Sequence, residues 1–512
     1  MGLIFYPRGG SAQVARYLSR ALDGAGWEVS LACGSLGAAG TPSHAATFFD
    51  GLSVTAADYD PAIGARAAGR DPLEEPVPMH PSFEDGGDTA DRVFAAVSPR
   101  IGAHLIASWE RILADAWTDP TLFHLHHLTP IHAAVQRRWP TRPILTHLHG
   151  TELKMLDRIE RLVDLARALD TTLAGMADRA RADTVPKLDS LSPTQRALFE
   201  STDWAHWRFG VHWAELLGAF ARRSDRIVAI SSHDRDEALR LLGLDESRIE
   251  LIPDGVDTDR FDRRVAGPEE QLSRWRGWLV TDPRGWDESG EPGSIRYDEQ
   301  DLRPFVDRKT GEPSPVLLYV GRFLDFKRVP LLVRAYVRAS PRFARPAPLV
   351  IWGGSPGEWD GEHPHTVARR EGAEGIFFLG WRGHEDLPDG LACADALVTA
   401  SSYEPFGLPL LEAMACGVPV IATRSGGPLT FVNTESGRPN GWMVEPDDVD
   451  ALANALVEAV NDVDGRKQRG ENAYEQIRSA YSWRVIAERF AASYEALAGN
   501  SKAYSLSRGD WI

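Results

Sequence analysis

The chain has 512 residues, of which 43% are hydrophobic and 25% are charged, and its formal net charge at pH 7 is -17. This length and composition are typical of a globular protein large enough for two or three hydrophobic cores. The negative balance opposes a nucleic-acid interface and bulk attraction to anionic lipid, although a local basic pair such as Arg16 with Arg20 escapes this average and leaves a peripheral membrane contact open.

Signals for membrane insertion and for disulfides are weak. The longest apolar runs are broken by charge or glycine before the roughly 18 to 20 residues that a membrane span requires, and the start MGLIFYPRGG lacks a basic segment followed by an apolar one. Cys33, Cys393 and Cys416 are scattered in apolar contexts, which predicts reduced, buried thiols. We therefore expect a cytoplasmic protein without integral membrane association.

Strand-like and helical runs alternate from the start of the chain. A short strand LIFY leads through a glycine turn into a helix from about Ser11 to Ala25. Further strands are expected at WEVSLA, TLFHLHH, RPILTHLHG, RIVAIS and IELIPD, and after the turn Asp254-Gly255 at PVLLYVGR, APLVIWGG, GIFFLGW, DALVTAS and VPVIATRSGG. This alternation predicts two doubly wound α/β domains with parallel sheets.

Two segments fit neither repeat. Residues 37–91 are rich in Ala, Gly, Pro and Asp and are expected to form a long surface insertion in the first domain. Residues 262–315 carry Trp275, Trp278 and Trp286 among charges, glycines and prolines. We expect these tryptophans to pack onto a domain surface, with a lid or an acceptor wall as the functional alternative.

Two glutamates flank a loop that opens a helix in the stretch SSYEPFGLPLLEAMACGVPVIATRSGG. The strand DALVTA precedes Glu404, and Leu408, Leu411 and Met414 recur at helical spacing around Glu412. The carboxyl end of such a strand is where open α/β sheets bind ligands, and the first amides of the helix favour a phosphate. Ionised carboxylates only accept hydrogen bonds, so the pair suits the diols at the two ends of a nucleotide sugar. Two solvated glutamates on a helix edge are the alternative.

This spacing, with PFGLPLLEA between the glutamates, resembles the signature of family 4 retaining glycosyltransferases with the GT-B fold. The resemblance implies α/β architecture with two Rossmann-like domains facing a central cleft. Residues 1–255 would bind the acceptor, residues 256–484 the nucleotide-sugar donor, and residues 485–512 would form a C-terminal helix that crosses back to the first domain.

The resemblance also assigns residues to the donor. Glu404 would meet the hydroxyls of the donor sugar and Glu412 the ribose diol. The donor loop between them includes Phe406, Gly407 and Leu408.

A basic loop follows the strand VLLYVGR and contains Gly321, Arg322 and Lys327. A departing nucleoside diphosphate gains negative charge, and cations held beside it lower the barrier without a metal. The family resemblance gives this task to Arg322 and Lys327, while a solvated basic loop is the alternative. For the nucleobase, the resemblance points to two strand ends, whose residues are Gly353, Gly354, Trp381 and Arg382.

In the first domain, Gly9, Gly10 and Ser11 stand between the first strand and the first helix. Glycines there let the backbone approach a ligand and leave the helix N-terminus open. A turn that only closes the strand is the alternative. By resemblance, this loop lies near the donor phosphate or the acceptor, and Ser11 is an acceptor candidate.

Histidines end two strands of the first domain. His149, in LTHLHGTEL, matches the family histidine that faces the donor sugar near C6, and it is predicted to act in catalysis. A core histidine is the alternative. His124, His126 and His127 lack Cys or carboxylate partners at a recognised ligand spacing, so no metal site is predicted there. His126 is the candidate for acceptor contact.

Taken together, these motifs predict a retaining, metal-independent transfer of a hexosyl unit from a UDP- or GDP-sugar to a small soluble acceptor. No cofactor is expected, and Asp257-Thr258-Asp259 is interpreted as a coincidental match to the metal-binding D-x-D pattern. The alternatives are a disaccharide phosphorylase of the same fold and a catalytically silent nucleotide-sugar-binding protein. The sequence does not identify the acceptor, the donor base or the oligomeric state.

Overall fold

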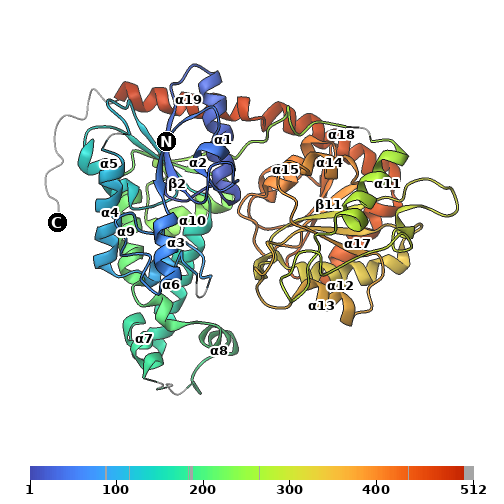
Figure 1. The fold of residues 1–512 in the computed structure, drawn as a ribbon, viewed down its shortest axis with the longest axis horizontal. Coiled ribbons are helices and arrows are strands. Elements are labelled where there is room, and N and C mark those ends of the chain that lie inside the picture. The colour runs from blue at the N-terminus through green and yellow to red at the C-terminus, as the bar shows by residue number, and fades with distance from the viewer. Residues whose placement is uncertain are drawn as a thin grey trace. The chain divides into compact units, whose positions relative to one another are not determined.

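The computed structural model describes residues 1–86, 89–114, 116–182, 184, 188–264, 266–435 and 437–500. The chain forms two compact units, Met1–Pro253 with the residues from Ala487 onward, and Asp254–Ile486. Each unit has one parallel sheet with helices around it (Figure 1). This confirms the doubly wound α/β class. Of the predicted C-terminal segment, residues 501–512 lie outside the described ranges.

The first unit is built on a seven-stranded sheet in the order β3-β2-β1-β4-β5-β6-β7, and its paired strands are parallel. The strand order reverses at β1, so the switch point where such sheets bind ligands lies at the carboxyl ends of β1 and β4. The strands are β1 (Gly2–Leu3), β2 (Ser30–Ser35), β3 (Ser53–Asp58), β4 (Phe123–His126), β5 (Ile144–His147), β6 (Arg226–Ala229) and β7 (Ile249–Leu251).

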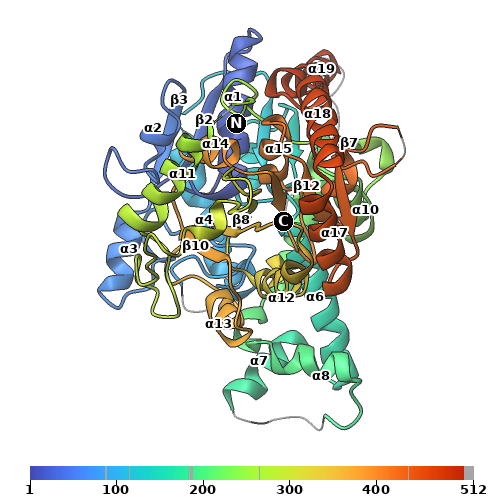
Figure 2. The ribbon, with the colours of Figure 1, turned by 90° about the vertical axis from the view of Figure 1, so that its right-hand side faces the viewer.

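The helices of this unit include two, α7 and α8, that extend beyond its body past the end of α6 in both ribbon views (Figures 1 and 2). Ser192 and Gln195 form a capping box that fixes the start of α8. The helices are α1 (Gly9–Gly24), α2 (Ala45–Phe48), α3 (Asp60–Ala67), α4 (Pro99–Ile112), α5 (Ile131–Arg138), α6 (Thr151–Ala168), α7 (Leu173–Arg181), α8 (Pro193–Glu200), α9 (Gly210–Arg223), α10 (Ser232–Leu242) and α19 (Trp483–Asn500).

Residues 37–91 differ from the predicted surface insertion. They contain β3, which pairs with β2 along its whole length, and α3 directly after it. Tyr59, between the two, is buried and donates a 2.7 Å hydrogen bond to the carbonyl of Ile4. The part of this segment from β3 through α3 is therefore the edge of the sheet and part of the core.

Helix α19 completes the first unit from the far end of the chain. Phe490 is fully buried, and Tyr494 packs edge-on against Trp27 with 5.1 Å between ring centroids. Arg489 donates a 2.5 Å hydrogen bond to the carbonyl of Leu251. These contacts confirm the expected return of a C-terminal helix to the first domain.

The second unit has a six-stranded parallel sheet in the order β10-β9-β8-β11-β12-β13, which reverses at β8. Its strands are β8 (Leu317–Gly321), β9 (Leu349–Gly353), β10 (Ile376–Gly380), β11 (Ala396–Val398), β12 (Val420–Thr423) and β13 (Gly441–Val444). Its helices are α11 (Pro268–Arg276), α12 (Val329–Ala339), α13 (Pro364–Arg370), α14 (Leu387–Ala392), α15 (Leu408–Ala415), α16 (Pro428–Phe431), α17 (Val449–Asn461) and α18 (Val463–Ala480).

The tryptophans of residues 262–315 pack as expected. Trp275 and Trp286 are each 1% exposed. The indole N–H of Trp286 donates to the carbonyl of Gly354 over 3.1 Å, which fixes the segment to the end of β9.

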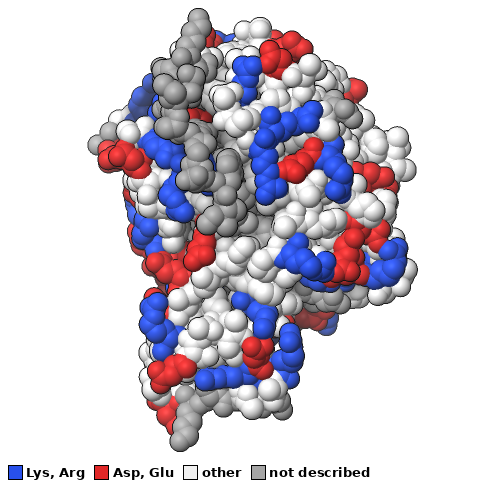
Figure 3. Space-filling model, turned by 90° about the vertical axis from the view of Figure 1, so that its left-hand side faces the viewer, with Lys and Arg blue, Asp and Glu red and all other residues white. Residues whose placement is uncertain are grey.

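Other expectations of the composition also hold. Cys33, Cys393 and Cys416 are buried free thiols, and burial raises the pKa of each to about 12. None of the described helices is both long and apolar enough to cross a membrane. On the face of the molecule in Figure 3, basic and acidic side chains are interspersed among the described residues.

The ends of β8 and β9 meet through glycine. Gly353 has φ +136°, and a Cβ on it would lie 2.1 Å from the carbonyl oxygen of Gly321. The next amide, of Gly354, donates a 3.0 Å hydrogen bond to that same oxygen. A side chain at Gly353 would therefore push the two strand ends apart.

We expect Gly353→Ala to destabilise the second unit by about 1–3 kcal/mol more than Gly437→Ala. Gly437 also has a strained φ, +123°, but nothing lies within 4 Å of an added Cβ there. The backbone strain is thus shared, and only Gly353 adds the steric clash. Urea unfolding of both variants measures the difference, and equal losses would contradict the close approach.

Candidate active site

Lys327 and Glu404 form a partly buried ion pair at the carboxyl edge of the second sheet. Lys327 ends a short 3-10 helix, η6 (Asp325–Lys327), after β8, and Glu404 lies in the loop after β11. The Lys327 Nζ lies 2.8 and 2.6 Å from the two carboxylate oxygens of Glu404, and the Ser401 hydroxyl donates to one of them over 2.9 Å. Because β8 and β11 are paired neighbours, the predicted donor residues of two loops come together.

Close glycine contacts shape the Glu404 loop. Gly407, the N-cap of α15, has φ +97°, and a Cβ on it would lie 3.2 Å from Cγ of Glu404. The backbone of Gly426 approaches the Glu404 carbonyl so closely that a Cβ would lie 2.1 Å away. The Gly427 amide donates to the same carbonyl over 2.8 Å. The glutamate side chain is thus held by a backbone that only small residues permit.

Glu412 lies within α15, as predicted, and is 7% exposed. Its Oε1 is 2.7 Å from Nε2 of His384, a residue not predicted for the site. The His384 ring packs on Phe261, with 5.1 Å between centroids. A histidine shortly after a strand end in GWRGHED was the available signal, but nothing in the sequence paired it with Glu412.

The remaining predicted donor residues divide into exposed and buried groups. Arg322 and Trp381 are exposed, Trp381 by 50%. Phe406 is buried, with its ring 5.4 Å from that of Phe431. Gly321, Gly353 and Gly354 form the tight strand ends described above, and Leu408 is the first residue of α15.

The side chain of Arg382 binds a neighbouring segment of the chain. Its guanidinium lies 3.0 Å from the Asp282 carboxylate and donates to the carbonyl of Trp278 over 2.6 Å. Burial lowers the pKa of Arg382, which the ion pair with Asp282 opposes. The side chain therefore braces residues 277–282, and a donor contact from Arg382 would have to come from its backbone.

In the first unit, Gly9 opens α1 at the end of the loop after β1. Gly9 and Gly10 are exposed, Gly9 has φ +71°, and nothing lies within 4 Å of a Cβ built on it. Ser11 follows in the first turn. The Arg8 side chain turns to Tyr6 and Asp91 and does not cap the helix. The helix start is thus open, as a ligand-binding loop requires.

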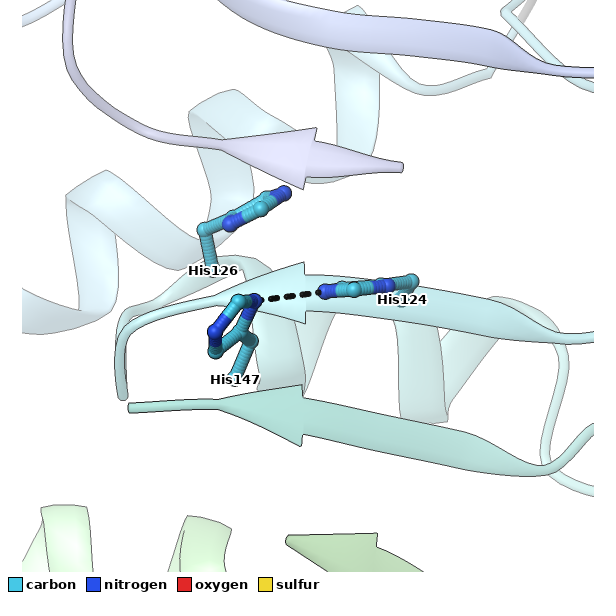
Figure 4. A group of neighbouring side chains, drawn as sticks. All are labelled: His124, His126 and His147. Carbon is cyan, nitrogen blue, oxygen red and sulfur yellow. Dashed lines mark hydrogen bonds between the residues drawn. The ribbon is translucent and has the colours of Figure 1, made fainter. Parts of the chain in front are cut away.

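The predicted histidines lie together on two neighbouring strands (Figure 4). His124 and His126 lie on β4, and His147 lies on β5 in register with His126. The His124 Nε2 and His147 Nδ1 atoms are 3.3 Å apart, and His126 Nδ1 lies 3.0 Å from Nε2 of His149. His149 is 8% exposed, whereas His126 is fully buried, which opposes the predicted acceptor contact of His126.

Burial keeps these imidazoles neutral. It lowers the pKa of His147 to about 3 and that of His149 well below its usual value, the latter with help from neighbouring histidines. Glu152 is fully buried beside them and accepts hydrogen bonds from Nδ1 of His127 and from the amide of His149. A neutral His149 can both donate and accept a hydrogen bond, as contact with a sugar hydroxyl requires.

Comparison with known families assigns both halves of the chain. Residues 8–260 match the model described as Glycosyltransferase Family 4, and residues 303–476 match Glycosyl transferases group 1. The chain therefore belongs to the glycosyltransferases with a family 4 first domain and a group 1 second domain.

Its relatives include D-inositol 3-phosphate glycosyltransferase 2 of Catenulispora acidiphila, 29% identical over 53% of this chain and 56% of that protein. The lipopolysaccharide core biosynthesis glycosyltransferase LpsE of Rhizobium meliloti is 31% identical over 35% of this chain and 50% of that protein. The chain spans about half the length of the curated relatives it matches.

Solved structures show the same fold over nearly the whole chain. Sucrose-phosphate synthase from Thermosynechococcus elongatus has a TM-score of 0.58 at 18% identity and covers 97% of this chain and 98% of its own. Anabaena HepE in complex with UDP-glucose has a TM-score of 0.56 at 16% identity, covering 97% and 100%. The fold is GT-B, as predicted.

We expect the Lys327–Glu404 pair to be strongly coupled. Lys327→Met leaves a buried carboxylate without its cation and should cost about 3 kcal/mol of stability. Glu404→Gln in the same chain should recover much of this loss, because a neutral amide needs no cation. A double-mutant cycle from urea unfolding measures the coupling, and additive losses would contradict the ion pair.

Acid should destabilise the first unit through its buried imidazoles. Burial lowers the pKa of His132 from 6.5 to about 4. Below pH 6.5 the His132 imidazole binds a proton in the unfolded chain but not in the folded chain. The free energy of unfolding is therefore unaffected by this group above pH 6.5 and decreases as the pH falls toward 4. His132→Gln should reduce the slope of stability against pH by up to about 1.4 kcal/mol per pH unit. Unfolding at several pH values measures this, and unchanged slopes would contradict it.

Proposed function

We propose that the protein is a retaining glycosyltransferase that moves a hexosyl unit from a UDP- or GDP-sugar to a small soluble acceptor without a metal ion. The observation that carries this proposal is the partly buried Lys327–Glu404 pair at the switch point of the second sheet, with Glu412 on the helix that follows the same loop. Cation, carboxylates and helix start are the groups that a sugar diphosphate needs.

In this proposal the glutamates bind hydroxyl groups. Glu404 has two carboxylate oxygens to accept from the donor sugar, and Glu412 accepts from the ribose diol while His384 holds one of its oxygens. Lys327 and Arg322 offset the charge that grows on the diphosphate as it leaves. Arg322 can contact two oxygens at once, whereas Lys327 is a point charge, so the two suit a diphosphate.

The bond change takes place on one face of the sugar. The bond from the anomeric carbon to the donor phosphate breaks, and the acceptor oxygen bonds to that carbon from the same side. The leaving phosphate takes the acceptor's proton. No side-chain nucleophile is required, and His149, neutral through burial, orients a sugar hydroxyl.

Two alternatives have distinct signatures. A phosphorylase of this fold would turn over a disaccharide with inorganic phosphate and without nucleotide. A silent binder would keep the fold without turnover. The presence of Glu404, Arg322 and Lys327 together favours a transferase over a silent binder.

Nucleotide binding is tested by thermal shift with UDP, GDP, ADP and dTDP. One of them should raise the melting temperature by several degrees. Glu412→Ala should abolish that shift, because the ribose loses its carboxylate. Asp259→Ala, in the D-x-D match, should keep it. If Glu412→Ala responds as the wild type does, the ribose assignment is wrong.

Transfer should retain the anomeric configuration of the donor and should proceed without added Mg²⁺ or Mn²⁺. The donor to try first is UDP-glucose, which the fold neighbour HepE holds. Proton NMR of the product formed on a panel of sugar and cyclitol acceptors reports the configuration. An inverted product, or strict dependence on added divalent cation, would contradict the proposed mechanism.

A further inference from the structure

The histidines of β4 and β5 form a cluster that the proposed transfer reaction does not use as a whole. His124 and His126 are two residues apart on β4, so their side chains lie on one face of the sheet. His147 joins them on that face because it is paired with His126. One ring nitrogen from each lies within 4.8 Å of the others, and all three side chains are buried (Figure 4).

We propose that His124, His126 and His147 form a binding site for one zinc ion. Zinc takes imidazole nitrogens at about 2.0–2.1 Å in tetrahedral geometry, which places neighbouring ligand atoms about 3.3 Å apart. The Nε2 of His124 and Nδ1 of His147 already lie 3.3 Å apart. The His126 ring stacks 4.6 Å from that of His124, and one of its nitrogens lies within 4.8 Å of ring nitrogens of the other two histidines.

Contacts of the outer nitrogens of His124 and His126 support this assignment. A metal-bound histidine almost always bonds through its other ring nitrogen to a second group that fixes the ring. Nδ1 of His124 lies 2.5 Å from the Tyr494 hydroxyl, and Nδ1 of His126 lies 3.0 Å from Nε2 of His149. Nε2 of His126 is buried and has no hydrogen-bond partner among the described residues. An ion would satisfy that nitrogen.

The chemistry of the ligand set favours zinc over other cations. Calcium and magnesium require oxygen ligands, whereas imidazole suits zinc. Three protein ligands leave a fourth position open.

A bound ion would also act on the neighbouring site residue. With Nε2 of His126 on zinc, its Nδ1 carries the proton and donates to Nε2 of His149. His149 would then keep its own proton on Nδ1. The link to catalysis rests on the proposed role of His149, but zinc binding itself does not depend on it.

Metal content of the full chain tests the site. Protein stripped with a chelator and then incubated with zinc should retain about one ion per chain after gel filtration. His147→Gln and His124→Gln should weaken binding by more than about 100-fold, since each removes a ligand. The control is His132→Gln, which replaces another fully buried histidine of the first unit outside the three ligands and should bind zinc as the wild type does.

Two measurements keep the test decisive if a ligand variant fails to fold. Tyr494→Phe leaves all three ligands and should weaken zinc binding by about 10–100-fold through the lost outer contact. Cobalt in place of zinc should give the visible absorption bands of a tetrahedral site. The proposal is overturned if the wild type retains no zinc and shows no zinc-dependent rise in melting temperature. The proposal is also overturned if His132→Gln loses as much zinc as His147→Gln and His124→Gln do. Direct hydrogen bonds between the imidazoles would then account for the close contacts of the three histidines.

Discussion

The pairing of β8 with β11 is the constraint on which the second unit's site depends. These strands are far apart in sequence, yet they lie side by side because the sheet reverses its order at β8. The loops that leave their carboxyl ends must therefore share one space. Lys327 comes from one loop and Glu404 from the other, and each neutralises a charge that the other loop alone would leave buried. The order of the strands in the sheet thus determines which charged side chains meet in the site.

Each donor glutamate has a basic partner of a different kind. Glu404 pairs with a lysine, Lys327, whereas Glu412 pairs with a histidine, His384. An acceptor-only carboxylate buried without a partner would be costly, so the partners make the site stable before a ligand arrives. In the proposed donor complex, the hydrogen bonds of Glu404 would partly rearrange to accept from sugar hydroxyls, while Glu412 would offer its second oxygen to the ribose.

Local sequence patterns predicted the fold class and the positions in the fold of most candidate donor residues. The strands before Arg322 and Glu404, and the helix carrying Glu412, follow from apolar periodicity and glycine. The strand within residues 37–91 was missed because its sequence, SVTAAD, consists of small and polar residues rather than the bulky apolar residues of a central strand. Such residues are compatible with a strand at the edge of the sheet, where β3 lies. The Glu412–His384 contact and the pairing of His126 with His147 depend on strand order and register, which no local pattern encodes.

The hydrogen bond between His124 and Tyr494 joins residues 370 positions apart, and the whole second unit lies between them in the sequence. During synthesis on the ribosome, β4 is therefore made long before the helix that covers its histidines. Phe490 and Tyr494 can pack on the histidines of β4 and β5 only after α19 has been made. The first unit therefore cannot complete its core until the chain of the second unit has been made.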